Sequence, residues 1–342
     1  MVFLKTSRLA IAGTVLGALS NVALAVNPPV KVMQINTWMQ GGVVTNGEQM
    51  IFDRVRDYEP DIVLFCEVQH AKAFGESFIA YMKEHKLHYE VDSATSGNMV
   101  ASKYHIVRSG TCKSGTYAEL EHDGRTILAC SLHLYYCDYA CYLPRGYHGK
   151  TWKKLEKPES DVKKVIEMNL HSERYLAVED ALKVARPYRD KGDLVIIGGD
   201  FNEPSHLDWT ERTKNLYDHN GIVMPWHSTL ALEKGGYQDT YREKFPDEVK
   251  YPGFTFPMNN TAVPEAKLSW APDADERDRI DFLFYNTNAP GKLTRAAMRG
   301  PDTTIVRGKR DAAPLPGERI RFNGNWPTDH AATIAEFEFV KK

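Results

Sequence analysis

Residues 194–204 read LVIIGGDFNEP, and this stretch is the centre of the sequence. Four uninterrupted apolar residues predict a strand buried on both faces, because a half-exposed strand would alternate. The two glycines allow the backbone to bend and approach a neighbour closely, and Pro204 ends the strand. Asp200 and Asn202 therefore share one face where a strand becomes a loop, a place where α/β folds carry ligand chemistry. A simple Asx turn is the alternative for Asp-x-Asn alone.

The length and composition allow one large α/β unit. The chain has 342 residues, which by length alone also permits about two domains of ~150 residues. Hydrophobic residues make up 42% and charged residues 26%, which is ordinary for a globular protein with a sizeable core. No repeat, low-complexity tract or linker divides the sequence, so we expect one domain over residues 26–342.

The first 25 residues have the pattern of a signal peptide. Lys5 and Arg8 precede an apolar run over residues 9–19, and Ala23-Leu24-Ala25 forms a small-residue cleavage site. We expect an exported chain that begins at Val26, with an uncleaved N-terminal anchor as the alternative. No later stretch has the ~18 apolar residues of a transmembrane helix. Removing the two basic residues takes the formal charge from −2 to −4, so overall charge does not favour a polyanionic partner.

Five cysteines lie in the expected mature chain, and an exported protein permits disulfides. Cys137 and Cys141 share one polar, aromatic loop and are the best candidates for a pair. Cys66 and Cys130 fall in strand-like runs and suit buried thiols. The odd number, which includes Cys112, leaves at least one unpaired. The CxxC and HExxH spacings that are typical of zinc sites do not occur in the sequence.

Other segments also place polar residues at the ends of apolar runs. The expected strands carry these residues near one end: residues 30–38 with Asn36, 62–66 with Glu67, 126–136 with His133, 280–285 with Asp281, and 332–340 preceded by Asp329 and His330. Helices are expected over residues 48–58, 71–85 and 159–189, the last broken or bent before Pro187. Asp123-Gly124 predicts a hairpin turn, and a further short strand is expected around residues 304–306. Taken singly, Glu67 could pair with a cation and His133 could be a hydrogen-bonded core residue.

Residues 135–155 form an insert that interleaves aromatic and basic side chains. Aromatic faces beside cations suit stacking and anion contact, so Tyr142, Arg145 and Trp152 are candidate substrate-binding residues. The alternative is a loop that packs its own aromatic side chains against the body of the protein. Both interpretations stay open at this point.

Together the strand-end residues supply what metal-assisted attack on a phosphate requires. Carboxylates and a carboxamide hold a hard divalent cation through oxygen. Histidines paired with acids transfer protons near neutral pH. Amides neutralise charge that develops on the phosphoryl oxygens.

The motifs GGDFN, DRIDFLF and TDH, in this order after an N-terminal Asn and a strand-end Glu, resemble the endonuclease/exonuclease/phosphatase superfamily. The resemblance runs from QINTW to TDHAATIAEFEF and suggests an exported, bacterial-type member. It implies the deoxyribonuclease-I-like fold, an α/β four-layer sandwich of two packed, mainly antiparallel sheets flanked by helices. The catalytic site is then expected at one end of the sandwich.

The resemblance also implies roles for the strand-end residues. Glu67 would be the principal metal ligand, with Asn36 beside it and Asp329 in the metal shell. The implied ion is Mg²⁺, with Mn²⁺ or Ca²⁺ as alternatives.

The implied catalytic residues divide the work of phosphoester hydrolysis. His330 would transfer a proton, oriented by Asp281, and His133 would lie on the far side of the phosphate. Asp200 would activate or orient water, and Asn202 would contact phosphate oxygens.

The insert leaves the substrate open. His133 in SLHL is similar to the deoxyribonuclease-I and neutral-sphingomyelinase branches. Tyr142-Leu143-Pro144-Arg145 only partly matches the abasic-site endonucleases, since Arg145 replaces the Asn expected there.

We therefore expect an exported Mg²⁺-dependent phosphoester hydrolase, with phosphodiesters favoured because two histidines can serve as base and acid. The expected partner is a phosphoester substrate: nucleic acid, phospholipid head group or sugar phosphate. No obligate protein partner is evident. The alternatives are a secreted deoxyribonuclease-I-like nuclease, a non-catalytic binding protein on the same fold, and a zinc hydrolase.

Overall fold

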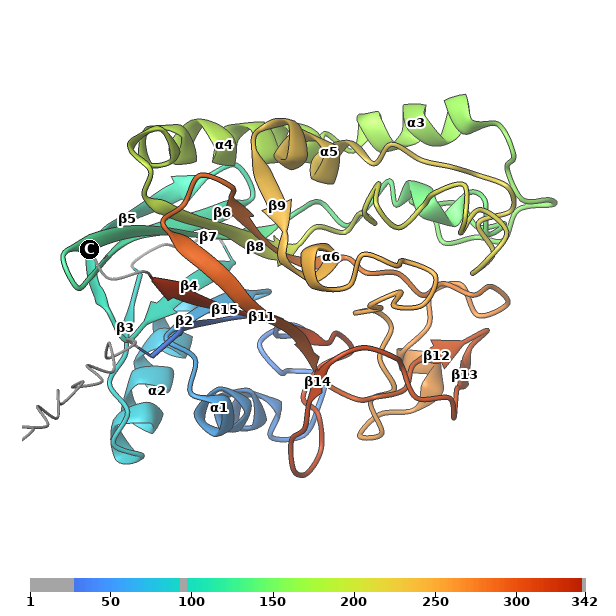
Figure 1. Cartoon of the computed structure of the whole chain (residues 1–342). Helices are drawn as coiled ribbons and strands as arrows, with labels where there is room; N and C mark the ends of the chain where they lie inside the picture. The colour runs from blue at the N-terminus through green and yellow to red at the C-terminus, as the bar shows by residue number, and fades with distance from the viewer. Residues whose placement is uncertain (1–27, 93–96, 340–342) are drawn as a thin grey trace, which may run out of the picture.

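A computed structural model describes residues 28–92 and 97–339. The expected signal peptide, residues 1–25, lies outside them. Two β-sheets stack face to face, and helices cover both outer faces (Figure 1). Most neighbouring strands pair antiparallel, so the predicted α/β sandwich of two mainly antiparallel sheets flanked by helices is confirmed. Within the described ranges, no helix has the length and apolar character needed to cross a membrane.

The first sheet has seven strands in the described part of the chain. Their spatial order is β14 (Arg319–Ile320), β11 (Gly291–Arg299), β15 (Ala332–Phe339), β1 (Val30–Asn36), β2 (Ile62–Cys66), β4 (Asn98–Ser102) and β3 (Glu90–Val91). Strands β1 and β2 run parallel with Asn36 opposite Cys66, so both end at the same edge. Helices α1 (Gly47–Tyr58) and α2 (Ala71–Glu84) cover the outer face of this sheet.

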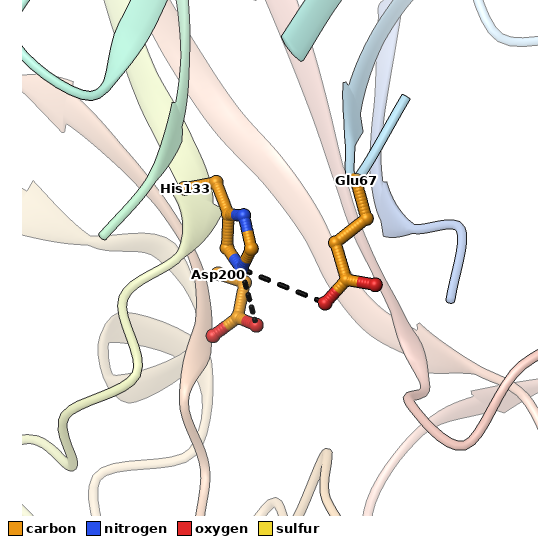
Figure 2. A group of neighbouring side chains, drawn as sticks. All are labelled: Glu67, His133 and Asp200. Atoms are coloured by element: carbon orange, nitrogen blue, oxygen red, sulfur yellow. Dashed lines mark ion pairs between the residues drawn. The ribbon is translucent and has the colours of Figure 1, made fainter. Parts of the chain in front are cut away.

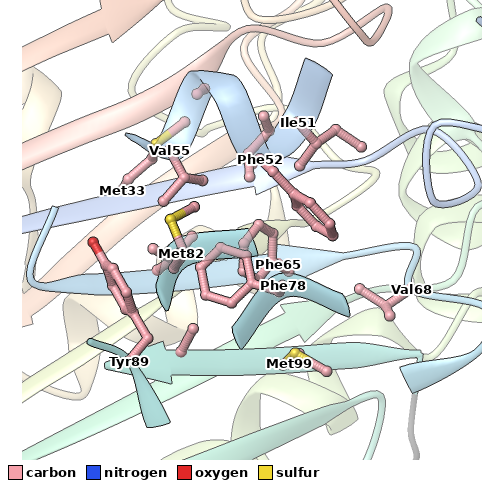
Figure 3. Packing of buried hydrophobic residues seen from close by; sticks show 14 of the residues in the cluster. Met33, Ile51, Phe52, Val55, Phe65, Val68, Phe78, Met82, Tyr89 and Met99 are labelled. Carbon is pink, nitrogen blue, oxygen red and sulfur yellow. The ribbon is translucent and has the colours of Figure 1, made fainter. Parts of the chain in front are cut away.

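A cluster of apolar side chains joins these two helices to the first sheet (Figure 3). Ile51 and Val55, four residues apart on α1, both point inward, as the helical spacing of residues 48–58 predicts. Phe78 of α2 meets Phe65 of β2 edge-on, with ring centroids 5.5 Å apart. Each fully buried side chain of this kind stabilises the fold by about 1.5–3 kcal/mol.

The second sheet has six strands among the described residues. Their order is β5 (His105–Cys112), β6 (Gly115–His122), β7 (Arg125–His133), β8 (Leu194–Asp200), β10 (Asp281–Asn286) and β9 (Tyr237–Asp239). Helices α4 (Arg174–Lys191) and α5 (His227–Lys234) pack on its outer face. The predicted turn at Asp123-Gly124 joins β6 to β7, and both residues have the positive φ that such hairpin turns require.

Strand β8 is buried along its whole length, as its apolar run predicts. A Cβ atom on Gly199 would lie 1.8 Å from the carbonyl oxygen of Leu132 in β7. A Cβ atom on Gly198 would lie 2.7 Å from the carbonyl oxygen of Phe282 in β10. The two glycines therefore allow β8 to pass closely between its neighbours, and this closeness positions Asp200.

Three boundaries differ from the predictions. The helix expected over residues 159–189 is two helices, α3 (Val162–His171) and α4, because Glu173 turns left-handed between them, while Pro187 lies inside α4. Strand β7 ends at His133, and the strand expected near residue 305 is only β12 (Ile305–Val306), paired with β13 (Lys309–Arg310). The prediction missed β11, since GKLTRAAMR mixes charged residues with alanines and has no apolar run.

The remaining elements are short and lie in the loops. They are the 3-10 helices η1 (Ala140–Tyr142) and η2 (Glu265–Lys267) and the helix α6 (Thr240–Lys244).

Candidate active site

The register of the second sheet brings three predicted site residues to one edge. His133 lies opposite Asp200 in the parallel pair β7 and β8. Asp281 lies opposite Asp200 in the antiparallel pair β8 and β10. Three separate segments thus meet at Asp200, which is almost completely buried.

Asn36 links this edge to the first sheet. Its Nδ2 donates to Asp200 Oδ2 at 2.9 Å and to Glu67 Oε1 at 3.0 Å. Glu67 follows β2 in a left-handed conformation, and its Oε2 accepts from the backbone N–H of Met39 at 2.8 Å. Among the described residues, the ion-pair partner of Glu67 is His133 rather than a Lys or Arg. The Glu67 carboxylate therefore has no Lys or Arg counter-ion in the described part of the chain and stays available to a cation.

Glu67, His133 and Asp200 point toward one another (Figure 2). His133 Nε2 lies 3.6 Å from both Glu67 Oε1 and Asp200 Oδ2. Asn202 Nδ2 lies 3.2 Å from the same ring nitrogen and donates to the carbonyl oxygen of Leu134 at 3.0 Å. The Asx turn exists as well, since the backbone N–H of Asn202 donates to Asp200 Oδ1 at 2.8 Å. The Asx turn and the site are thus compatible, because the turn itself places the Asn202 side chain beside His133.

His330 and Asp281 form a second, buried pair. The two are joined by Nδ1 and Oδ2 at 2.8 Å. Gln34 Nε2 donates to the other Asp281 oxygen at 3.0 Å, and the ring of Phe256 packs 4.9 Å from the His330 ring. These contacts hold the imidazole so that Nε2 lies 3.9 Å from Asp200 Oδ2.

The buried charges shift several pKa values. Burial opposes the imidazolium of His330, but the carboxylates of Asp281 and Asp200 outweigh burial and raise the His330 pKa well above its usual range. Burial raises the pKa of Asp200 to about 6, partly offset by His330. Burial also raises the pKa of Asp329 to about 7, with the negative charge of Glu67 adding to the effect despite His330. Perturbed acids and bases in one place are typical of catalytic sites.

The residues present fit a hard divalent cation. Glu67, His133 and Asp200 each offer a ligand atom within 4.8 Å of one another, and so do Asp200, Asp281 and His330. The first group suits a metal better, because Asp281 is already bonded to both His330 and Gln34. Glu67 and Asp200 bring two carboxylates together, neither of them paired with a Lys or Arg that the structure describes. Carboxylate oxygens are the ligands that Mg²⁺ prefers.

A cavity of about 560 Å³ opens over these residues. Its acid floor consists of Glu67, His133, Asp200, Asn202, Asp329 and His330. Its aromatic wall consists of Tyr136, Tyr139, Tyr142, Trp152 and Trp270. The other lining residues are Trp38, Met39, Val68, Gln69, Gly97, Phe256 and Ile280, so no described Lys or Arg lines the cavity.

The insert contributes two of its three predicted substrate-binding residues. Tyr142 and Trp152 line the cavity, with ring centroids 5.7 Å apart. Arg145 does not, and its assignment to substrate binding is wrong. Its side chain is fully buried, pairs with Asp278 and donates to the carbonyl oxygen of Arg277 at 3.0 Å. The N–H donors of this guanidinium are already hydrogen-bonded inside the protein, so they cannot also bind a substrate phosphate.

The predicted pair of Cys137 and Cys141 is also wrong, since the structure has both as free thiols. Cys141 is buried in η1 between Tyr139 and Tyr142, and burial raises the pKa of its thiol well above the usual range. Aromatic packing and buried polar contacts such as Arg145 with Asp278, rather than a covalent link, hold the insert. The expectation that Cys66 and Cys130 are buried thiols agrees with the structure.

Several site residues were missing from the sequence prediction. Trp270 lies in the loop before β10, 5.5 Å from the Trp152 ring. Glu276 ties that loop to the insert: it accepts from the Tyr142 hydroxyl and from the backbone N–H of Trp270 at 3.1 Å. Gln34 had a detectable signal, a polar side chain two residues before Asn36 and so on the same strand face. Trp270 and Glu276 had none, because their roles depend on contacts with a distant loop.

Comparison with known proteins agrees with this geometry. Residues 33–330 match the model of the Endonuclease/Exonuclease/phosphatase family, and the chain belongs to this family. Its members are typically metal-dependent phosphoester hydrolases. An uncharacterized protein of Caenorhabditis elegans is 28% identical over 327 residues, which cover 91% of this chain and 92% of that protein.

Two solved structures share the fold. TDP2 from Caenorhabditis elegans has a TM-score of 0.53 at 16% identity, covering 91% of this chain and 74% of that one. D. rerio TDP2 complexed with single strand DNA product has a TM-score of 0.50 at 13% identity, covering 91% and 99%.

Proposed function

We propose that this chain is a Mg²⁺-dependent phosphodiesterase, exported after cleavage near Ala25. The position of Asp200 carries the proposal. Its Oδ2 lies 3.6 Å from His133 Nε2 and 3.9 Å from His330 Nε2, and it accepts from Asn36, the same amide that holds Glu67. One carboxylate thus connects two histidines and a cation-binding group, as hydrolysis of a phosphoester by water requires.

The residues divide the reaction as follows. Asp200 orients the attacking water and accepts its hydrogen bond. His330, held by Asp281, carries positive charge beside the phosphate and moves the proton. His133, oriented by Asn202, faces the phosphate from β7, the neighbouring strand to Asp200. Glu67 would be the principal ligand of Mg²⁺, with Asp200 and His133 within reach of the same ion and Asn36 and Asp329 beside them. The ion would supply charge neutralisation and Lewis acidity when bound.

The presence of two histidines favours a diester over a monoester substrate. A leaving alkoxide needs a proton, and a second group must handle the proton of the attacking water. The D. rerio neighbour with single strand DNA product supports a nuclease as the second candidate.

Hydrolysis of bis-p-nitrophenyl phosphate tests the proposal. We expect turnover with Mg²⁺, loss of turnover with EDTA, and a fall of about 10²–10⁴-fold in His330→Ala, the usual contribution of a general acid or base. His105→Ala is the matched control, because His105 is an exposed histidine paired with Glu90 away from the cavity. Metal-independent turnover, or an unaffected His330→Ala, contradicts the mechanism. Sequencing the N-terminus of the secreted protein tests cleavage before Val26.

A further inference from the structure

Four of the seven large hydrophobic side chains that are exposed in the described residues lie at or beside the mouth of the cavity. Among the described residues, the large hydrophobic side chains that are exposed are Met39, Val107, Tyr135, Tyr136, Leu170, Val249 and Trp270. Met39, Tyr136 and Trp270 line the cavity, and the Tyr135 ring lies 5.7 Å from that of Tyr136. We call these four residues the apolar rim.

The apolar rim comes from three segments that are far apart in the sequence. Met39 follows β1, Tyr135 and Tyr136 follow β7, and Trp270 lies before β10. Single exposed apolar residues are normal, whereas a group around one opening marks a contact surface. Tyr and Trp in particular favour the boundary between water and lipid, because each joins an apolar ring to a polar group.

The charges of the cavity oppose a polymeric anion. Its floor carries Glu67, Asp200 and Asp329, and no described Lys or Arg lines it. A nucleic acid brings many phosphates, which proteins normally meet with Lys and Arg along a groove. Lys150 and Lys153 flank Trp152 in the sequence but lie outside the lining.

The same charges favour a cation beside the scissile phosphate. An ammonium group is attracted to aromatic faces, most strongly where water is excluded. Tyr139 and Tyr142 at the inner part of the aromatic wall are buried, and Trp152 and Trp270 continue the wall toward the rim. A substrate with one phosphate and one ammonium group matches both the floor and the wall.

Building on the proposed phosphodiesterase function, we propose that the substrate is a zwitterionic phospholipid, taken from a membrane surface on which the apolar rim rests. The head-group ammonium lies against the aromatic wall and the phosphate over the acid floor. Water forms a new P–O bond, the P–O bond to the lipid alcohol breaks, and the proton of the water ends on that alcohol. The products are the free lipid alcohol and the phosphorylated head group.

Sedimentation with phosphatidylcholine vesicles in EDTA tests the surface without catalysis. The double variant Tyr136→Ser/Trp270→Ser should lower the partition constant between water and vesicles by about tenfold or more, because two interfacial rings are lost. The matched control Val107→Ser/Val249→Ser removes two exposed apolar side chains away from the cavity and should bind as the unaltered protein does. Circular dichroism confirms that both variants are folded. Equal loss of binding in both variants, or no binding by the unaltered protein, overturns the proposal.

A substrate comparison with Mg²⁺ tests the chemistry. We expect release of phosphocholine from phosphatidylcholine vesicles at a rate at least about tenfold above cleavage of a single-stranded DNA oligonucleotide, whose further phosphates find no described cation in the cavity. Faster cleavage of the oligonucleotide overturns the lipid assignment and supports the nuclease. If bis-p-nitrophenyl phosphate is cleaved but vesicles are neither bound nor hydrolysed, the inference alone fails. If bis-p-nitrophenyl phosphate is not cleaved, the proposed function itself fails.

Discussion

The acid floor and the aromatic wall of one cavity are built in different ways. The floor stands on strand ends, where register places His133 and Asp281 opposite Asp200. The wall stands on loops, and its rings are held by side-chain contacts such as that of Tyr142 with Glu276. Strand pairing fixes positions through the backbone, so the floor tolerates little change of geometry. The wall depends on buried polar anchors behind it, so those anchors should control its stability.

The comparison predicts its largest effect at the floor. Asp281→Asn removes the charge that orients His330 and raises its pKa. We expect kcat for bis-p-nitrophenyl phosphate to fall about 10²–10⁴-fold, and any limb of the pH profile that belongs to His330 to move to lower pH. Asp190→Asn, an exposed aspartate paired with Arg189, is the control. A loss of less than about threefold would show that the pair does not serve catalysis.

The next largest effect concerns the buried ion pair of Arg145 and Asp278, which anchors the insert that carries the aromatic wall. Arg145→Met leaves Asp278 buried without its partner, which should lower the free energy of unfolding by about 3–5 kcal/mol in urea titrations. Adding Asp278→Asn should recover part of this loss, because the unpaired charge is gone. At urea concentrations below the unfolding transition, the KM of Arg145→Met for bis-p-nitrophenyl phosphate should equal that of the unaltered protein. Unchanged stability with a raised KM would return Arg145 to substrate binding.

The next prediction is pH-dependent and tests whether water is excluded from His219, which lies behind the aromatic wall. His219 stacks on Trp209, over which Arg145 also lies, and burial with the Arg145 charge lowers its pKa to about 2. The unfolded chain takes up this proton near pH 6.5 and the folded chain does not, so stability falls as pH drops below that value by about 1.4 kcal/mol per unit.

His219→Phe keeps the stacking ring and removes the titration. Urea unfolding at pH 7.5 and 5.5 should therefore show a smaller loss for the variant, by about 1 kcal/mol. Comparing the two proteins cancels the contributions of the floor. Equal losses would mean that water reaches His219.

The smallest effect separates packing from covalent linkage. Cys137 is a half-buried free thiol, so Cys137→Ser should change the free energy of unfolding by less than about 0.5 kcal/mol, with or without reductant. Loss of a disulfide to Cys141 would instead cost about 2–5 kcal/mol in thermal or urea unfolding. A loss of that size would reverse the correction made to the insert.

Much of the floor was readable in the sequence because its signals are local. Glu67 and Asp200 each follow an apolar run directly, and the glycines before Asp200 indicate close backbone approach. Such a signal needs only a strand period and a break in it. The same reasoning failed at β11, where no apolar run marks the strand, and at Glu173, where a left-handed residue divides one helical pattern in two.

The sequence by itself placed the residues of the acid floor at the ends of apolar runs, because a strand and its end are local patterns. The two-sheet sandwich was implied by the order of the motifs, through the resemblance to a known superfamily. Only the tertiary structure decided the aromatic wall and the apolar rim. Arg145 and Asp278 are 133 residues apart, and Tyr142 and Glu276 are 134 apart, so no local pattern reveals either contact. Whether an arginine faces a substrate or a buried aspartate depends on which distant loop folds against it.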